Sequence, residues 1–255
     1  MKHNSQKGST LIVVLLLLLA IIVIGTLAVR QSIISLNIAT NSQIQQLIMQ
    51  NNDAGFYNIE KPENIIESLT SSGMFGYIGG PNNVDKELVF CFKGNEEEFF
   101  DISRASLIYW KSGSLQPTNN ELGTDGYCDA ETTDDNYYTS DRRAVMTQVA
   151  VKFSTQNEQN DPFFGMQLGT DEQVVKFERS KMVKVFTVSV MPSLTTNRDK
   201  INVCLKQRMH EVTVPADTTV LPNVEARQSV TECLEGINVP FTSHVTEYVL
   251  AQDFI

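Results

Sequence analysis

One uninterrupted apolar segment near the amino terminus constrains this chain more than any other feature of its sequence. From Gly8 to Val29 no residue carries a charge, and leucine, isoleucine and valine dominate. The 22 residues between Lys7 and Arg30 would form a helix of about 33 Å. That length matches the ~30 Å hydrocarbon core of a bilayer. The segment therefore predicts a single membrane span.

The distribution of charge predicts where the rest of the chain lies. Lys2 and Lys7 precede the span, whereas most acidic residues follow Asp53. Because basic residues are retained on the cytoplasmic side, we expect the amino terminus in the cytoplasm and the bulk of the chain across the membrane. The chain has 30 acidic and 20 basic residues, a net charge of -10. Such a surface repels phosphate, so we expect no direct binding to nucleic acid.

Three kinds of amino-terminal segment compete to explain the apolar run. A secretory signal would be cleaved near Thr26-Leu27-Ala28, although the apolar core of such a signal is normally only about 7–15 residues long. An uncleaved signal anchor fits the length. In the third arrangement the cut falls after Gly8, before the apolar stretch, which then remains in the mature protein as an anchor.

The third arrangement resembles the class III signal of type IV prepilins and pseudopilins. The motif is Lys7-Gly8-Ser9-Thr10-Leu11-Ile12, and a leucine-rich run leads on to Gly25-Thr26-Leu27-Ala28-Val29-Arg30-Gln31-Ser32. Over about the first 50 residues this pattern looks like that of the PilX type of minor pilin. In that family a prepilin peptidase cuts after the glycine and methylates the new amino terminus. The resemblance assigns these roles to Gly8 and Ser9.

Two positions depart from the pattern of most pilins. The mature chain would begin with Ser9 instead of Phe, and Val13 occupies the fifth mature position, where most pilins carry glutamate. In major pilins that buried glutamate is thought to pair with the terminal amine of a neighbouring subunit, which offsets a buried charge. PilX-type pilins and the K-type pseudopilins of type II secretion resemble each other in lacking it, and both are associated with the fibre tip. The resemblance therefore implies a tip or minor subunit.

An amphipathic helix is predicted to continue the span. Between Arg30 and Asn52 there is no further charge, and isoleucine and leucine recur at intervals of three and four residues. No proline occurs before Pro62, so one helix of about 45 residues, roughly 68 Å, can run from Ser9 to near Asp53. The predicted divisions are a leader at 1–8, the transmembrane half of the helix at 9–29, its amphipathic half at 30–55, and a globular head at 56–255.

Short apolar runs after Pro62 predict a sheet. The strand candidates are Leu88–Phe92, Ser106–Trp110, Ala144–Phe153 and Met182–Val190, with shorter runs at Glu211–Val214, Ser229–Cys233 and Val245–Leu250. Alternation in the third run indicates a half-buried strand with Gln148 and Lys152 on its less apolar face, and we expect the fourth run to be central. The fold class is α+β, a long helix laid on an antiparallel sheet, which the resemblance to pilins also implies. The polar stretch from Lys111 to Arg143 is too long for a bare loop.

Four cysteines lie in the predicted head: Cys91, Cys128, Cys204 and Cys233. An even number outside the cytoplasm favours disulfides. Of the three possible pairings we favour the one that joins sequence neighbours, Cys91 with Cys128 and Cys204 with Cys233. The second pair would resemble the disulfide-bounded loop near the end of many pilins. A metal site is the alternative, although no CxxC motif occurs.

The sequence offers little catalytic chemistry. His3, His210 and His244 form no HxxxH or HExxH motif, and we expect the last two on the surface or in loops; GxSxG, phosphate-loop and GxGxxG motifs do not occur. We therefore expect a protein that is not an enzyme and that has no cofactor. Oxygen ligands of the kind that Ca²⁺ binds do cluster around the second cysteine, although their spacing matches no EF-hand loop. These calcium candidates are Asp125, Asp129, Glu131, Asp134 and Asp135. A solvated acidic loop and a protein contact surface are the competing interpretations.

Taken together, the resemblance implies a structural minor pilin of a Gram-negative bacterium. It would prime assembly of a type IV pilus, sit at or near the fibre tip, and help to display an adhesin for twitching, adhesion or DNA uptake. The implied partners are other minor pilins, the major pilin and a large tip adhesin. The implied location is the inner membrane, with one span and a periplasmic head, and then the surface pilus. The alternatives are a single-pass inner-membrane protein with a periplasmic binding or sensing head, and a K-type pseudopilin.

Overall fold

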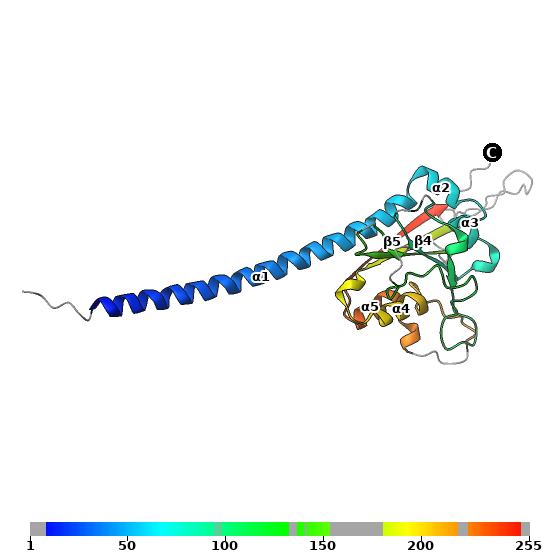
Figure 1. Cartoon of the computed structure of the whole chain (residues 1–255). Helices are drawn as coiled ribbons and strands as arrows, with labels where there is room; N and C mark the ends of the chain where they lie inside the picture. Colours follow the sequence, from blue (N-terminus) through cyan, green and yellow to red (C-terminus); the bar gives the residue numbers. More distant parts are fainter. Residues whose placement is uncertain are drawn as a thin grey trace, which may run out of the picture. The chain divides into compact units, whose positions relative to one another are not determined.

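The chain forms two units, residues 1–46 and residues 47–255. The computed structural model describes residues 9–94, 96, 98–132, 137–140, 142–153, 181–218 and 224–250. A continuous helix, α1 (Ser9–Ile59), has 51 residues and supplies all of the first unit that is described (Figure 1). It is six residues longer than predicted, and in these additional residues the side chains of Phe56 and Ile59 are buried in the head.

A five-stranded antiparallel sheet forms the centre of the head. Its strand order is β2-β1-β3-β4-β5, so β3 is central and β4, expected to be central, is the interior strand beside it. The strands are β1 (Glu87–Phe92), β2 (Ser106–Ile108), β3 (Met146–Phe153), β4 (Lys181–Val190) and β5 (Phe241–Leu250). The predicted α+β fold, a long helix packed on an antiparallel sheet, is confirmed.

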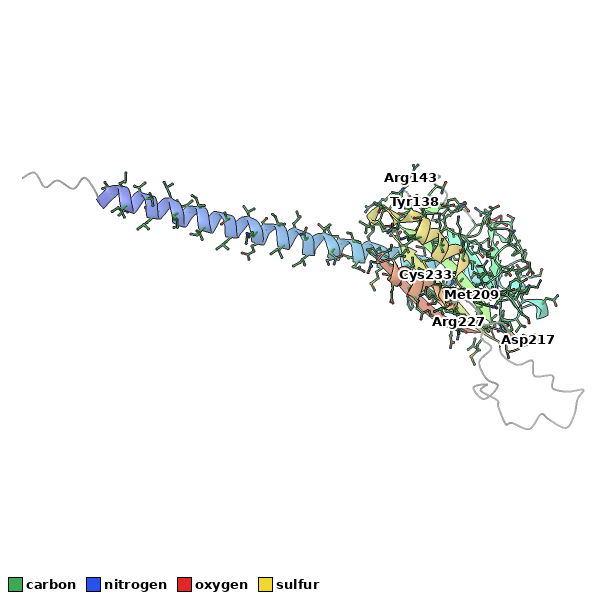
Figure 2. All side chains as sticks on the ribbon, turned by 90° about the horizontal axis from the view of Figure 1, so that it is seen from below. Tyr138, Arg143, Met209, Asp217, Arg227 and Cys233 are labelled. Atoms are coloured by element: carbon green, nitrogen blue, oxygen red, sulfur yellow. A yellow bond between two sulfur atoms is a disulfide. The ribbon has the colours of Figure 1, made fainter. Side chains whose placement is uncertain are left out.

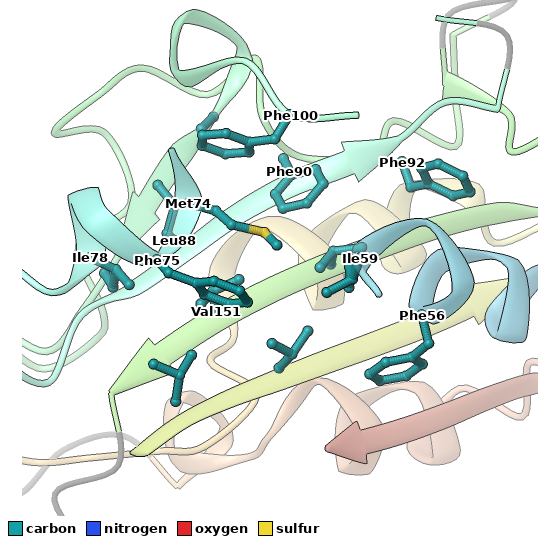
Figure 3. Close-up of a cluster of buried hydrophobic side chains, with 14 of the residues drawn as sticks. Phe56, Ile59, Met74, Phe75, Ile78, Leu88, Phe90, Phe92, Phe100 and Val151 are labelled. Atoms are coloured by element: carbon teal, nitrogen blue, oxygen red, sulfur yellow. The ribbon is translucent and has the colours of Figure 1, made fainter. Parts of the chain in front are cut away.

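The last turns of α1 cover one face of the sheet, which we call the helix face. Ile48, Asn52, Phe56 and Ile59 are buried at intervals of three and four residues, as a helix packed along one side requires. Phe56 and Ile59 join an apolar cluster with the short helix α3 (Met74–Ile78) and with alternate residues of β1, β3 and β4 (Figure 3). Each fully buried side chain of this size contributes about 1.5–3 kcal/mol.

A neutral hydrogen-bond network fixes α1 against the helix face. The Asn52 amide donates to Ser189 Oγ at 3.3 Å and to the Thr242 carbonyl at 3.2 Å, and its oxygen accepts from Thr187 Oγ1 at 2.9 Å. Thr147 Oγ1 lies 2.7 Å from Ser189 Oγ and continues the network. Because buried polar groups are costly without partners, this network specifies how the helix is rotated on the sheet.

The opposite face, which we call the far face, is also covered. Its cover consists of α4 (Arg198–Gln207), α5 (Val230–Gly236) and irregular segments, which enclose two further apolar clusters. Figure 1 shows α4 and α5 side by side at one end of the head, with α2 (Pro62–Ser68) and α3 at the other. Both faces of β3 are therefore buried. The expectation of a half-buried strand was wrong, since Gln148 and Lys152 are 1% and 0% exposed.

Two short strand candidates are not strands. The run at Ser229–Cys233 lies in α5, because Ser229 and Glu232 form a capping box in which each side chain binds the other's backbone N–H. The run at Glu211–Val214 is irregular backbone. In the described part of 111–143 there is no helix or strand of its own, yet Pro117, Tyr127 and Ala130 are buried in the head.

Candidate functional site

The first candidate surface is α1 itself, between Ser9 and Gln46. By length and composition this helix can cross a membrane, and none of its most apolar window is buried. Its leucine, isoleucine and valine side chains from Leu11 to Ile38 are between 48% and 72% exposed, and Figure 2 shows them along its whole length. The core helix of a soluble domain would bury such residues. Arg30 is the only charge between Ser9 and Asn52.

The predicted processing site falls at the boundary of the described chain. Gly8 lies outside the described residues, and α1 begins at Ser9. Val13, at the position where most pilins carry glutamate, is 51% exposed on the helix. With Val13 at this position, the beginning of α1 carries no acidic residue.

The four cysteines form two disulfides on the far face. Cys91 pairs with Cys128, 37 residues apart, and Cys204 pairs with Cys233, 29 residues apart. These are the sequence-neighbour pairs that we favoured over the other pairings and over a metal site. Cys91, Cys128 and Cys204 lie in one apolar cluster with residues of β3 and β4, and Cys233 packs against it. The first disulfide ties the irregular tract around Tyr127 to β1, and the second ties α5 to α4.

The acidic tract does not assemble as a calcium site in the part that the structure describes. Lys206 Nζ lies 2.7 Å from Asp129 Oδ2, and Asp129 Oδ1 accepts from Asn202 Nδ2 at 2.8 Å and from the Glu131 N–H at 2.9 Å. Burial alone would raise the pKa of Asp129, but Lys206 and these donors outweigh it and lower that pKa below its ordinary value. Asp129 therefore fastens the tract to α4.

Of the other calcium candidates, only some fall within the described residues. Asp125 lines a shallow hollow with Lys93, Glu96 and Arg104, and Asp134 and Asp135 lie outside the described residues. Within the described ranges no group of three or more histidine, cysteine or acidic side chains is placed to hold a metal ion.

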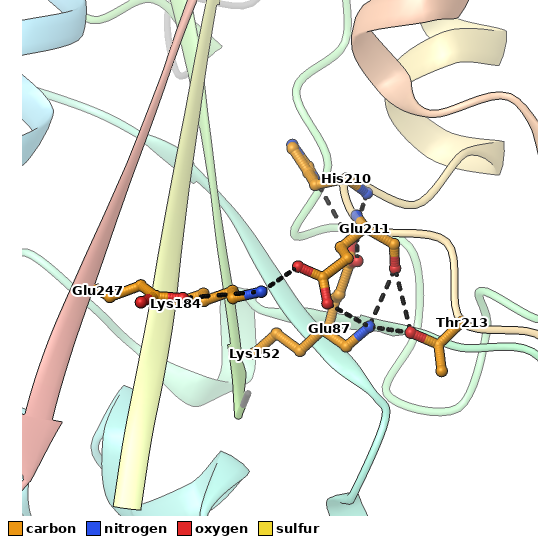
Figure 4. Close-up of polar contacts among 7 residues, drawn as sticks. All are labelled: Glu87, Lys152, Lys184, His210, Glu211, Thr213 and Glu247. Carbon is orange, nitrogen blue, oxygen red and sulfur yellow. Dashed lines mark hydrogen bonds and ion pairs between the residues drawn. The ribbon is translucent and has the colours of Figure 1, made fainter. Parts of the chain in front are cut away.

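A row of charged side chains crosses the far face, and sequence reasoning missed it (Figure 4). Lys152 on β3 pairs in register with Lys184 on β4, which pairs with Glu247 on β5. Two like charges directly opposite each other destabilise a sheet, but Glu211 lies between them. Its carboxylate is 2.7 Å from Lys184 Nζ and 3.8 Å from Lys152 Nζ. We call these four residues, with Glu87 on β1, the charge row.

Glu87 is the buried end of the charge row. It is fully buried, and its two carboxylate oxygens accept the backbone N–H groups of His210 and Glu211, both at 2.8 Å. Lys152 Nζ donates to the Glu211 carbonyl at 3.0 Å and contacts Thr213 Oγ1. The row thus holds the irregular segment Met209–Val214 on the sheet through hydrogen bonds from side chains to its backbone.

Glu87 also influences two aromatic side chains, those of His210 and Tyr127. His210, expected on the surface or in a loop, lies in the irregular segment Met209–Val214 with its side chain only 3% exposed and its Nδ1 3.2 Å from Glu87 Oε2. His244 is exposed on β5, with its ring 4.7 Å from that of Phe56. Burial, and secondly the negative charge of Glu87, raise the pKa of Tyr127. The sequence signal for the row was a charged residue within each of three otherwise largely apolar strands, namely Lys152, Lys184 and Glu247.

Comparisons with protein-family models, with curated proteins and with solved structures gave no match for this chain.

Proposed function

We propose that this chain is a structural, non-enzymatic minor pilin of the PilX type. It is cut between Gly8 and Ser9, held in the inner membrane by α1, and then extracted to prime a type IV pilus at or near its tip. One observation carries the proposal. The helix α1 is continuous over 51 residues, its most apolar part is not buried, and its last turns pack on an antiparallel sheet.

The composition of α1 supports this mechanism. In the bilayer an apolar helix has all its backbone hydrogen bonds satisfied internally and its side chains in lipid. From Gln31 to Gln46 the helix is uncharged but mixes amide and hydroxyl groups with exposed Ile33, Leu36 and Ile38. Such a surface can pack against helices of other subunits without charge repulsion. Val13 removes the acid that would otherwise need a partner amine, so the subunit can lead a fibre without docking beneath a predecessor.

The head supports a location outside the cytoplasm. Both disulfides lie on the far face, and disulfides persist in oxidising compartments. The partners that we propose are other minor pilins, the major pilin and a large tip adhesin, with the head in the periplasm before assembly and on the surface pilus afterwards.

Amino-terminal and intact mass spectrometry of the protein from membranes and from sheared surface fibres tests the proposal. We expect a chain that starts at methylated Ser9 in both fractions. The variant Gly8→Val should retain residues 1–8 and be missing from fibres, because a branched side chain replaces the glycine at the cut. Gly25→Ala, a change of similar kind inside the helix, should be processed as usual.

The other possible starts contradict the proposal. A chain that starts at Met1 would be a signal-anchored envelope protein with a binding or sensing head. A start at Val29 would be a secreted protein without an anchor. A chain processed at Ser9 but missing from surface fibres, and required for type II secretion, would be a K-type pseudopilin.

A further inference from the structure

The edge strand β5 is built differently from the edge strand at the other side of the sheet. β5 has ten residues, each paired one for one with β4 from Phe241↔Val190 to Leu250↔Lys181, with no bulge. None of the ten is buried. It ends the sheet, and within the described ranges no strand pairs with its outer side. The opposite edge, β2, has only three residues, all buried.

β5 lacks the features that normally keep an edge strand unpaired. Natural edges are shortened, bulged, covered, or marked with proline and lysine. The sequence Phe241–Leu250 contains no proline, lysine or arginine, and Glu247 is its only formally charged residue. Val245 and Val249 are 51% and 58% exposed. They flank Glu247 on the far face, where a neighbouring strand would cover them.

The charge row indicates what the neighbouring strand carries. Both lysines of the row, Lys152 and Lys184, lie within 4 Å of the Glu211 carboxylate, whereas only Lys184 comes that close to Glu247. Glu247 is less neutralised than Glu211, because Lys184 Nζ is 3.7 Å from Glu247 but 2.7 Å from Glu211. Its side chain is 50% exposed at the outer end of the row. A basic residue is the complement of that position.

We propose that the outer edge of β5 accepts an extended strand from a partner polypeptide, which pairs through its backbone. Opposite Val245, Glu247 and Val249 that strand presents apolar, basic and apolar residues, a pattern of apolar-x-Lys/Arg-x-apolar. The backbone supplies affinity and the alternate side chains supply selectivity, as in other cases of strand addition. This site is independent of whether the chain is processed as a pilin.

A synthetic strand tests the site directly on the full chain in detergent micelles. The probe is the peptide Thr-Val-Thr-Lys-Thr-Val-Thr, N-methylated on alternate residues so that only one edge can pair; both alternations are made. Binding is measured by fluorescence anisotropy, and its location by hydrogen exchange. We expect the better of the two peptides to bind and to slow exchange at about half of the amides in 241–250, since alternate amides face the outer edge.

Matched controls separate strand pairing from unspecific adhesion. A fully N-methylated peptide should not bind, and a peptide with Glu in place of Lys should bind more weakly. The double variant Val245→Lys/Val249→Lys should weaken binding at least about tenfold through like-charge repulsion. The double variant Val84→Lys/Val224→Lys adds the same charge at other exposed valines and should bind as the unchanged chain does. Glu247→Gln, which adds no bulk, should weaken binding about two- to fivefold.

Three results would overturn the proposal. If neither of the two alternately methylated peptides binds, the outer edge of β5 does not accept a strand. If the fully methylated peptide binds equally well, or if the Val245→Lys/Val249→Lys variant binds the alternately methylated peptide as well as the unchanged chain does, the peptide adheres elsewhere. If the unchanged chain forms a concentration-dependent dimer and Val245→Lys/Val249→Lys does not, the strand that pairs with β5 comes from a second copy of this chain and not from a different partner.

Discussion

The two faces of the sheet are covered by different means. The helix face carries a continuous helix, and apart from the neutral network around Asn52 its core is apolar and rich in phenylalanine. The far face carries two short helices and irregular segments, and it holds both disulfides and the charge row. The same sheet therefore meets a regular cover on one side and an irregular cover on the other.

This difference follows from where backbone hydrogen bonds are made. A helix satisfies its own N–H and C=O groups, so it requires only side-chain packing, whereas an irregular segment brings unpaired groups that are costly to bury. The far face answers with buried polar side chains. Glu87 accepts two N–H groups, and Lys152 donates to a carbonyl. Gln148 accepts from the Cys128 N–H and donates to the Leu205 carbonyl.

The largest expected effect comes from removing the buried end of the charge row. Glu87→Ala should lower the free energy of unfolding by about 3–5 kcal/mol, because it leaves the buried backbone N–H groups of His210 and Glu211 unpaired. Trp110, the only tryptophan and buried on the far face, reports unfolding by fluorescence in denaturant.

Glu247→Ala is the matched control for that experiment. It removes a carboxylate of the same row that is half exposed, so it should cost less than about 1 kcal/mol. Equal losses for the two variants would show that burial does not determine the strength of the row.

Loss of the second disulfide should be the next largest effect. Cys204→Ala/Cys233→Ala should cost about 3–4 kcal/mol for a loop of this length. Hydrogen exchange should accelerate first in 198–236 and stay slow in 47–59, because the helix face has its own packing. Simultaneous acceleration on both faces would mean that the two covers unfold as one.

A smaller loss is expected on the helix face. Asn52→Ala should cost about 1–3 kcal/mol, because Thr187, Ser189 and the Thr242 carbonyl lose their partner. Asn51→Ala is the neighbouring control, since among the described residues the Asn51 amide donates only to the Leu47 carbonyl of its own helix, and it should cost less than about 1 kcal/mol. The fluorescence of Trp110 again gives both values.

The smallest expected effect is that of Asp129 on the free energy of unfolding at low pH. The pKa of Asp129 is lower in the folded chain, so its contribution is complete above the unfolded value of about 3.9 and is lost as pH falls below it. Asp129→Asn should therefore flatten the stability curve below about pH 4, by less than about 1 kcal/mol, because the pair with Lys206 is partly exposed. If the free energy of unfolding of Asp129→Asn falls with acid as it does in the unchanged chain, other carboxylates are responsible for that pH dependence.

Sequence patterns predicted the sheet better than its cover. Short apolar runs located β1, β2, β3, β4 and most of β5, and the uncharged helix with its apolar spacing was correctly placed. Period two separates the faces of a strand but says nothing of what covers them, which is why Lys152 and Gln148 were expected on a half-exposed face. The capping box at Ser229 was a readable signal for α5 that the apolar run obscured.

The candidate site was less predictable, because it depends on residues far apart in the chain. The carboxylate of Glu211 pairs with Lys152 across 59 residues, and Lys206 pairs with Asp129 across 77. No local pattern connects such residues, and only the fold of the irregular cover brings them together.

The disulfide pattern has a consequence for how the chain matures. Each bond joins consecutive cysteines, Cys91 with Cys128 and Cys204 with Cys233. A chain delivered amino terminus first exposes one complete pair before the next cysteine emerges. An oxidant that joins cysteines in their order of appearance therefore makes the native bonds directly. The head can mature without a disulfide isomerase, and the irregular cover can be locked one segment at a time.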